Sequence, residues 1–162
     1  MTVNATVLRK LAEWRPPGNG CQTLVIPDEG AGWALTVTAN RRDDVGCVLE
    51  EVVLQATLGP AARRDATLTS WARRAAERVR GLLEPLRVVE IDLLRNEALL
   101  RSDEPARRGE DVAYHEILLQ GTTRATLRRY QASCQAGQRK QVPFALTHEA
   151  LAQVATDLAD SL

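Results

Sequence analysis

Hydrophobic residues recur with a helical period most clearly between Leu68 and about Leu83. Their steps of three and four residues place them on one side of a helix, while the charged residues between them fall on the other side. Thr67 is a suitable N-cap for this helix. Pro85 is expected to end it, because proline has no N–H to donate and its ring clashes with the preceding turn. Strand-like segments lie on both sides, so we expect the helix to pack across a sheet.

Two further segments have the same period. One extends from Ala5 to Trp14, with Asn4 as its expected cap. The other follows Thr147, whose hydroxyl can cap the helix, and Leu146 and Leu151 stand at the two positions of a hydrophobic staple.

Alternation of apolar and polar residues predicts strands between the helices. The predicted strands span residues 21–26, 33–39, 87–94, 98–101, 112–120, 124–133 and 142–145. In the segment 87–94 we expect Val89, Ile91 and Leu93 to face the core. Residues 47–58 fit both periods, and their valines favour a strand. We predict loops at residues 59–66, 102–111 and 134–141.

Together these elements predict a single two-layer α+β domain over residues 1–162. Its order is α-βββ-α-ββββ-α, with a mostly antiparallel sheet.

Two of the predicted strands have similar sequences. Glu51–Thr57 is EVVLQAT and Glu116–Thr122 is EILLQGT, so four positions are identical. One interpretation is an internal duplication of an α-βββ unit, with half-repeats at 4–58 and 67–122 and a closing strand and helix at 123–162. The alternative is a chance match between two aliphatic strands of similar composition.

The order of elements resembles the secretion-chaperone fold of class I type III secretion chaperones and the related YbjN-like proteins. The resemblance rests on the opening helix at Val7–Trp14, the three strands through Leu58, the helix at Leu68–Leu83 and the carboxy-terminal helix. It implies a small dimeric protein without catalytic residues, which holds an extended peptide or a partner on apolar patches. This chain differs from the usual secretion chaperone in its zero net charge and its somewhat greater length.

Composition agrees with a soluble globular domain, since 44% of the 162 residues are hydrophobic and 26% are charged. The 21 basic residues balance the 21 acidic ones, so no overall field favours nucleic acid or an anionic membrane. Low charge repulsion is compatible with a homodimer. The sequence contains neither a signal peptide nor an apolar run of about 20 residues, and its three cysteines are too few for a disulfide framework. We therefore expect a cytoplasmic protein.

Candidate chemistry is sparse, and we predict no metal and no cofactor. The sequence has no closely spaced pairs of cysteine or histidine of the kind that hold zinc. The glycines at 30 and 32 join two predicted strands, which indicates a turn and not a phosphate-binding loop. One alternative function is an orphan hydrolase or small-ligand-binding enzyme that pairs His115 with a cysteine such as Cys47.

A second alternative is a weak RNA-binding module. Arg124, Arg128 and Tyr130 share one face of a predicted strand, where arginines could contact phosphates and the tyrosine could stack on a base. The zero net charge and the small number of aromatic residues oppose this interpretation.

The function we predict is a non-enzymatic, cytosolic protein- or peptide-binding module of the chaperone or adaptor kind, in homodimeric form. Its candidate interaction surface comprises Trp33, Trp71, Arg124, Arg128 and Tyr130.

Overall fold

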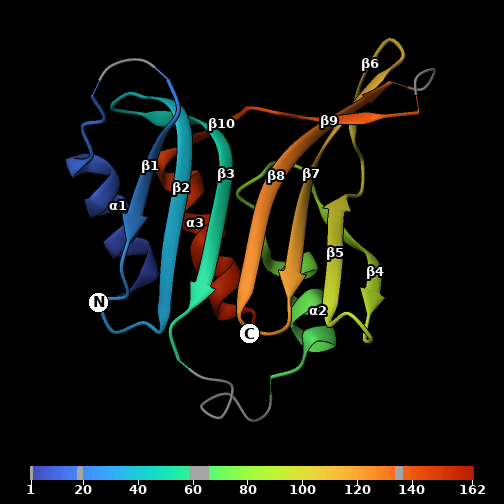
Figure 1. Cartoon of the computed structure of the whole chain (residues 1–162), viewed down its shortest axis with the longest axis horizontal. Helices are drawn as coiled ribbons and strands as arrows, with labels where there is room; N and C mark the ends of the chain where they lie inside the picture. Colours follow the sequence, from blue (N-terminus) through green and yellow to red (C-terminus); the bar gives the residue numbers. More distant parts are fainter. Residues whose placement is uncertain (1, 18–19, 59–65, 134–136) are drawn as a thin grey trace.

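The structure is a computed structural model that describes residues 2–17, 20–58, 66–133 and 137–162. These residues form three helices and ten strands (Figure 1). The elements are α1 (Val3–Glu13), β1 (Gln22–Ile26), β2 (Trp33–Arg42), β3 (Gly46–Ala56), α2 (Leu68–Arg78), β4 (Leu86–Asp92), β5 (Glu97–Ser102), β6 (Ala106–Arg108), β7 (Asp111–Gln120), β8 (Arg124–Ser133), β9 (Arg139–Val142), β10 (Phe144–Thr147) and α3 (His148–Asp160). The predicted α+β class is confirmed.

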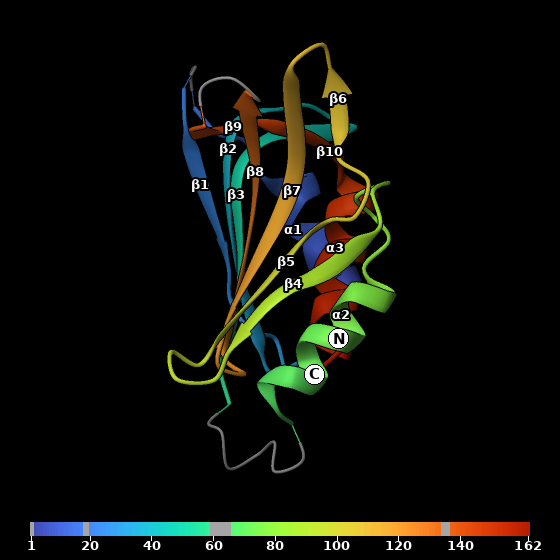
Figure 2. The ribbon, with the colours of Figure 1, turned by 90° about the vertical axis from the view of Figure 1, so that its right-hand side faces the viewer.

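All strands belong to one sheet, in the order β1-β2-β3-β8-β7-β5-β4, and all of its pairs are antiparallel. The three helices lie on the same face of this sheet (Figures 1 and 2). The opposite face has no helix from the described residues. We call it the open face.

The core lies between the sheet and the helices. In β2, Trp33, Leu35, Val37 and Ala39 are buried, as the predicted alternation requires. Helix α3 packs against both α1 and α2. Trp71 of α2 is fully buried in the core and its indole N–H donates to the carbonyl of Leu158 in α3 at 2.9 Å.

The centre of the sheet is forked. The first half of β3 pairs with β10, and only residues 52–55 of its second half pair with β8. The second half of β8 pairs with β9 instead. The segment β9–β10 therefore crosses the opening between β3 and β8 (Figure 1).

Helix α2 begins as predicted but ends earlier. Thr67 caps it, in a reciprocal capping box with Ser70. The helix ends at Arg78 and not at Leu83, so the prediction that Pro85 ends it is wrong. The reason is tertiary packing, because the chain after α2 lies so close to α3 that a Cβ on Gly81 would come within 2.8 Å of the carbonyl oxygen of Ala150.

Helix α1 begins at Val3, and its cap is Thr2, so the prediction that Asn4 caps it is wrong. Thr147 does cap α3, as predicted.

Strand β4 departs from the predicted alternation. A bulge between Val88 and Glu90 interrupts its register with β5. As a result Val88 packs against the core, Val89 is exposed and Leu93 is 72% exposed in the turn after the strand. Ile91 packs against the core as predicted.

Two of the predicted loops contain strands. Strand β6 lies within residues 102–111, and β9 occupies part of residues 134–141. Both strands are polar, so hydrophobic alternation could not reveal them. The predicted loop at 59–66 lies, apart from its last residue, outside the described residues.

The two similar segments flank β8 in the same register. Val52 of β3 and Ile117 of β7 are both paired with Leu127 of β8, and Leu54 and Leu119 are both paired with Ala125. The strands β3 and β7 are parallel, but their outer neighbours lie on opposite sides and all helices cover one face. No rotation superposes two such units. The arrangement therefore does not confirm a duplication, which stays a prediction.

Candidate functional site

The open face brings together a group of arginine and tyrosine side chains around the middle of β7 and β8. Ala125 and Leu127 of β8 are buried in the core, so Arg124, Arg128 and Tyr130 lie on the open face, as predicted. Glu116 of β7 is the strand partner of Arg128, and Tyr114 is the partner of Tyr130. The group that we call the Arg–Tyr cluster consists of Arg101, Tyr114, Glu116, Arg128, Tyr130 and Arg139.

Glu116 is the centre of this cluster. Its Oε2 accepts a hydrogen bond from Nε of Arg101 at 2.8 Å and another from Nη1 of Arg139 at 2.5 Å. Arg128, the strand partner of Glu116, donates to Oε2 of Glu51 in β3 instead, with Nε at 2.7 Å and Nη2 at 2.6 Å. Two carboxylates from two strands thus hold three guanidinium groups.

The rings of Tyr114 and Tyr130 contact the guanidinium groups of Arg101 and Arg139. The rings of Tyr114 and Tyr130 lie 6.2 Å apart. Cζ of Arg139 lies 3.9 Å from the centre of the Tyr130 ring, and Cζ of Arg101 lies 5.3 Å from that of Tyr114. Both are cation–π distances. Arg139 therefore covers one face of the Tyr130 ring.

The charges in the cluster are arranged by depth. Only 7% of the Glu116 side chain is exposed, whereas 34% of Arg101, 38% of Arg139 and 40% of Arg128 is exposed. Burial opposes the charged form of Arg139, but the hydrogen bonds that Arg139 donates to Glu116 and Tyr114 prevail and raise its pKa. Arg101 and Arg139 therefore lie over the buried carboxylate of Glu116, while the Glu51 side chain beside Arg128 is 26% exposed.

Only part of this site follows from the sequence pattern. Arg128 and Tyr130 lie on one strand face, as predicted, and Arg124 shares that face. Arg101 and Glu116 are not among the predicted surface residues, although the alternation of β5 and β7 assigns them to the same face. Arg139 could not be found, because the polar strand β9 was predicted as a loop.

The two predicted tryptophans are not on the surface. Trp71 is 0% exposed and Trp33 is 8% exposed, and their ring centres lie 5.8 Å apart in the core. In this fold they are not available to a partner.

His115 lies on the helix-covered face and belongs to a separate polar group. Its Nδ1 is 3.1 Å from Oε2 of Glu84 and 3.0 Å from Nη1 of Arg129, which also donates to Glu84 at 2.8 Å. Burial, together with the positive charge of Arg129, lowers the pKa of His115 to about 4. At neutral pH this imidazole is therefore uncharged.

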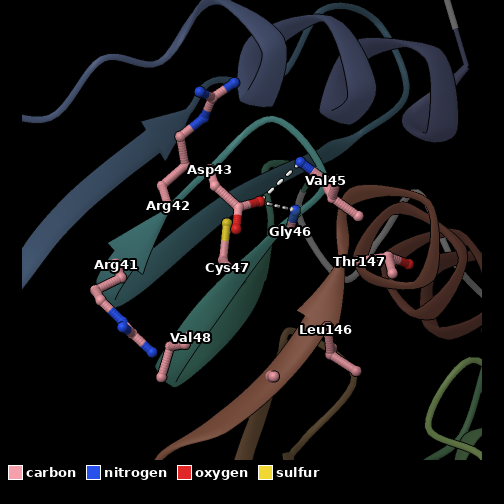
Figure 3. A pocket seen from close by; sticks show the side chains of 10 residues that line it. Arg41, Arg42, Asp43, Val45, Gly46, Cys47, Val48, Leu146 and Thr147 are labelled. Carbon is pink, nitrogen blue, oxygen red and sulfur yellow. Dashed lines mark hydrogen bonds between the residues drawn. The ribbon is translucent and has the colours of Figure 1, made fainter.

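Cys47 lines a different feature, a hollow of about 520 Å³ between the β2–β3 turn and β10 (Figure 3). Burial raises the pKa of its thiol to about 11, so it is protonated at neutral pH. The charged groups around it have local roles. Asp43 accepts from the backbone N–H groups of Val45 and Gly46, and Arg42 donates to the carbonyl of Leu11 at the end of α1.

Among the described residues, no three side chains of the metal-binding types come together, and no helix is long and apolar enough to cross a bilayer. No protein-family model, curated protein or solved structure matches this chain.

Proposed function

We propose that this protein is a non-enzymatic module that binds another protein or an extended peptide, of the kind that the resemblance to secretion chaperones and YbjN-like proteins implies. The observation that carries the proposal is the open face. A ten-stranded sheet leaves one side without a helix from the described residues, and that side presents the half-buried, paired side chains of Leu99 and Leu118 next to the Arg–Tyr cluster. Mixed apolar and arginine- and tyrosine-rich surfaces are typical of protein interfaces.

The hydrolase alternative has less support. Thiolate nucleophiles require a lowered thiol pKa and a base within hydrogen-bond reach. The pKa of Cys47 is raised, and the side-chain neighbours described for His115 are Glu84, Arg129 and Phe144.

A photo-crosslinking experiment tests the binding function. A benzophenone amino acid in place of Leu118 samples the open face, and the same group in place of the exposed Gln153 on α3 samples the helical side. We expect one protein to be linked from position 118 and not from 153, and the purified partner to bind the unmodified chain in solution. Equal labelling from both positions, or no labelling from 118, would contradict the proposal.

We further propose that the module is a homodimer joined at β1, which forms one edge of the sheet. This strand carries no charge, and Val25 is 61% exposed. The other edge strand, β4, carries Arg87, Glu90 and Asp92 as well as the bulge, which are features that discourage strand pairing. Antiparallel pairing about Leu24 would place Thr23 opposite Val25 of the second copy.

A further inference from the structure

We propose that the Arg–Tyr cluster is a receptor for the carboxylate groups of an acidic, extended peptide segment of the partner protein. This inference rests on the proposed binding function and names the chemistry of the partner.

Charge complementarity is the first argument. The three arginines of the cluster face two carboxylates, those of Glu51 and Glu116, so one positive charge is left over. The arginine side chains are 34–40% exposed, whereas the Glu116 side chain is 7% exposed. At Arg101 and Arg139 an approaching ligand therefore meets guanidinium groups before it meets the carboxylate of Glu116, whereas the Glu51 side chain beside Arg128 is 26% exposed.

Preorganisation is the second argument. Glu116 holds Arg101 and Arg139 at once, and the tyrosine rings support both guanidinium groups. Side chains that are already ordered lose less entropy on binding. Within the described residues Arg101 donates to Glu116 through Nε, which leaves its terminal nitrogens for the paired hydrogen bonds that a carboxylate accepts.

The cluster suits a peptide better than a nucleic acid. Base stacking needs an accessible ring face, and Arg139 lies over the Tyr130 ring at 3.9 Å. The zero net charge of the chain provides no long-range attraction for a polyphosphate. Arg128 and Arg101 flank Glu116 in one row of the sheet, two strands apart, which is about 10 Å. In a peptide with the polyproline II conformation, side chains three residues apart lie on the same side and are separated by about 9 Å.

Fluorescence anisotropy with a labelled dodecapeptide tests the inference. The probe carries Glu at every third position and Thr elsewhere, and the reference peptide carries Gln in place of Glu. We expect the Glu peptide to bind and the Gln peptide to bind at least tenfold more weakly. The double variant R101Q/R139Q should weaken binding of the Glu peptide by about tenfold or more. The matched control R73Q/R74Q, which removes the same charge from the exposed side of α2, should bind like the unmodified chain.

The variant Glu116→Gln separates a preorganised site from diffuse attraction. It makes the chain more positive, so diffuse attraction predicts tighter binding, whereas loss of the group that holds both arginines predicts weaker binding. Thermal unfolding checks that the variant is folded. Should it unfold, Arg139→Lys serves instead, because it keeps the charge but loses the planar group that stacks on Tyr130.

Three results would overturn the inference: equal binding of the Glu and Gln peptides, equal loss in the two double variants, or unchanged or tighter binding by E116Q. A labelled oligouridine that binds more tightly than the Glu peptide would also overturn it, in favour of a nucleic acid.

Failure of the inference differs from failure of the proposed function. If R101Q/R139Q abolishes peptide binding but not crosslinking from position 118, the cluster is not the partner's site and the function stands. If the peptide binds but position 118 links no protein, the function fails and the anion site remains.

Discussion

The imidazole of His115 lies between the carboxylate of Glu84, 31 residues away in the chain, and the guanidinium group of Arg129, its partner across the β7–β8 pair. Glu84 follows α2 and Arg129 belongs to β8, and only 7% of the histidine side chain is exposed. Alternation along β7 assigns His115 to the core face, but it does not identify these neighbours. The local sequence therefore made His115 a catalytic candidate, and its tertiary neighbours indicate a structural role.

We predict that His115 makes stability depend on pH. Its pKa is about 4 in the folded chain, below the ordinary value of 6.5, because burial and Arg129 disfavour the charged form. The neutral imidazole contributes fully to the free energy of unfolding above pH 6.5. Between pH 6.5 and 4 the unfolded chain binds the proton and the folded chain does not, so this contribution is lost as the pH falls. The loss is on the order of 3 kcal/mol, from 1.36 kcal/mol per pKa unit.

Urea unfolding at pH 7 and pH 4.5 measures this dependence. His115→Phe should show a smaller loss of unfolding free energy than the unmodified chain, because other groups titrate alike in both. An identical pH dependence would show that His115 does not contribute.

The single side chain of Trp71 links α2 to α3 through one hydrogen bond in the core. Trp71→Phe leaves the carbonyl of Leu158 without this donor and opens a cavity, so we expect a loss of about 2–4 kcal/mol. The control is Trp14→Phe at a half-buried position, where we expect a smaller loss. Equal losses in chemical denaturation would contradict the role of the hydrogen bond.

At the scale of elements, local sequence determines where α2 and α3 begin, whereas a tertiary contact determines where α2 ends. The starts of α2 and α3 are local, because Thr67 and Thr147 bond to backbone groups within their own first turn. The end of α2 depends on contact between Gly81 and α3, which no local pattern contains. Polar strands such as β6 and β9 are likewise specified by backbone pairing with a neighbour, so their sequences carry no apolar signal.

The start of β3 at Gly46 also depends on a contact with a distant segment, in this case β10. A Cβ at this position would lie 2.5 Å from the carbonyl oxygen of Leu146 and 3.0 Å from Cα of Thr147, both in β10. We predict that Gly46→Ala separates β3 from β10 and costs about 1–3 kcal/mol. Hydrogen exchange of the β10 amides should accelerate.

The control for this prediction is Val45→Ala at the adjacent, exposed position, where we expect a change within about 0.5 kcal/mol. Protection of β10 that survives in G46A would contradict the close approach of these strands.

At the scale of the whole molecule, the order of elements was predictable and the order of strands was not. Each helix and each amphipathic strand repeats its own period in the sequence, so α-βββ-α with further strands and a closing helix could be foreseen. The fork between β3 and β8 depends on pairings between residues that are far apart in the chain. For the same reason the Arg–Tyr cluster, which joins β5, β7, β8 and β9, could be predicted only for the part that lies on one strand.

The proposed dimer predicts a specific effect of charge at one edge of the sheet. Val25→Lys places a charge next to the centre of the β1 pair, opposite Thr23 of the second copy, and we expect it to shift the mass measured by light scattering from dimer to monomer. Val89→Lys, on the opposite edge strand β4, should leave the dimer intact. A monomeric mass for the unmodified chain at high micromolar concentration would show that the dimer prediction is wrong.

The fork in the sheet also has a consequence for synthesis on the ribosome. Strand β10 completes the pairing of β3, and α3 covers the core between α1 and α2, yet both come from residues that are translated after all the strands they complete. The chain up to β8 therefore leaves the exit tunnel with its central apolar surface uncovered. We therefore expect stable folding to wait until α3 has emerged, and the partly synthesised chain to expose apolar surface until then.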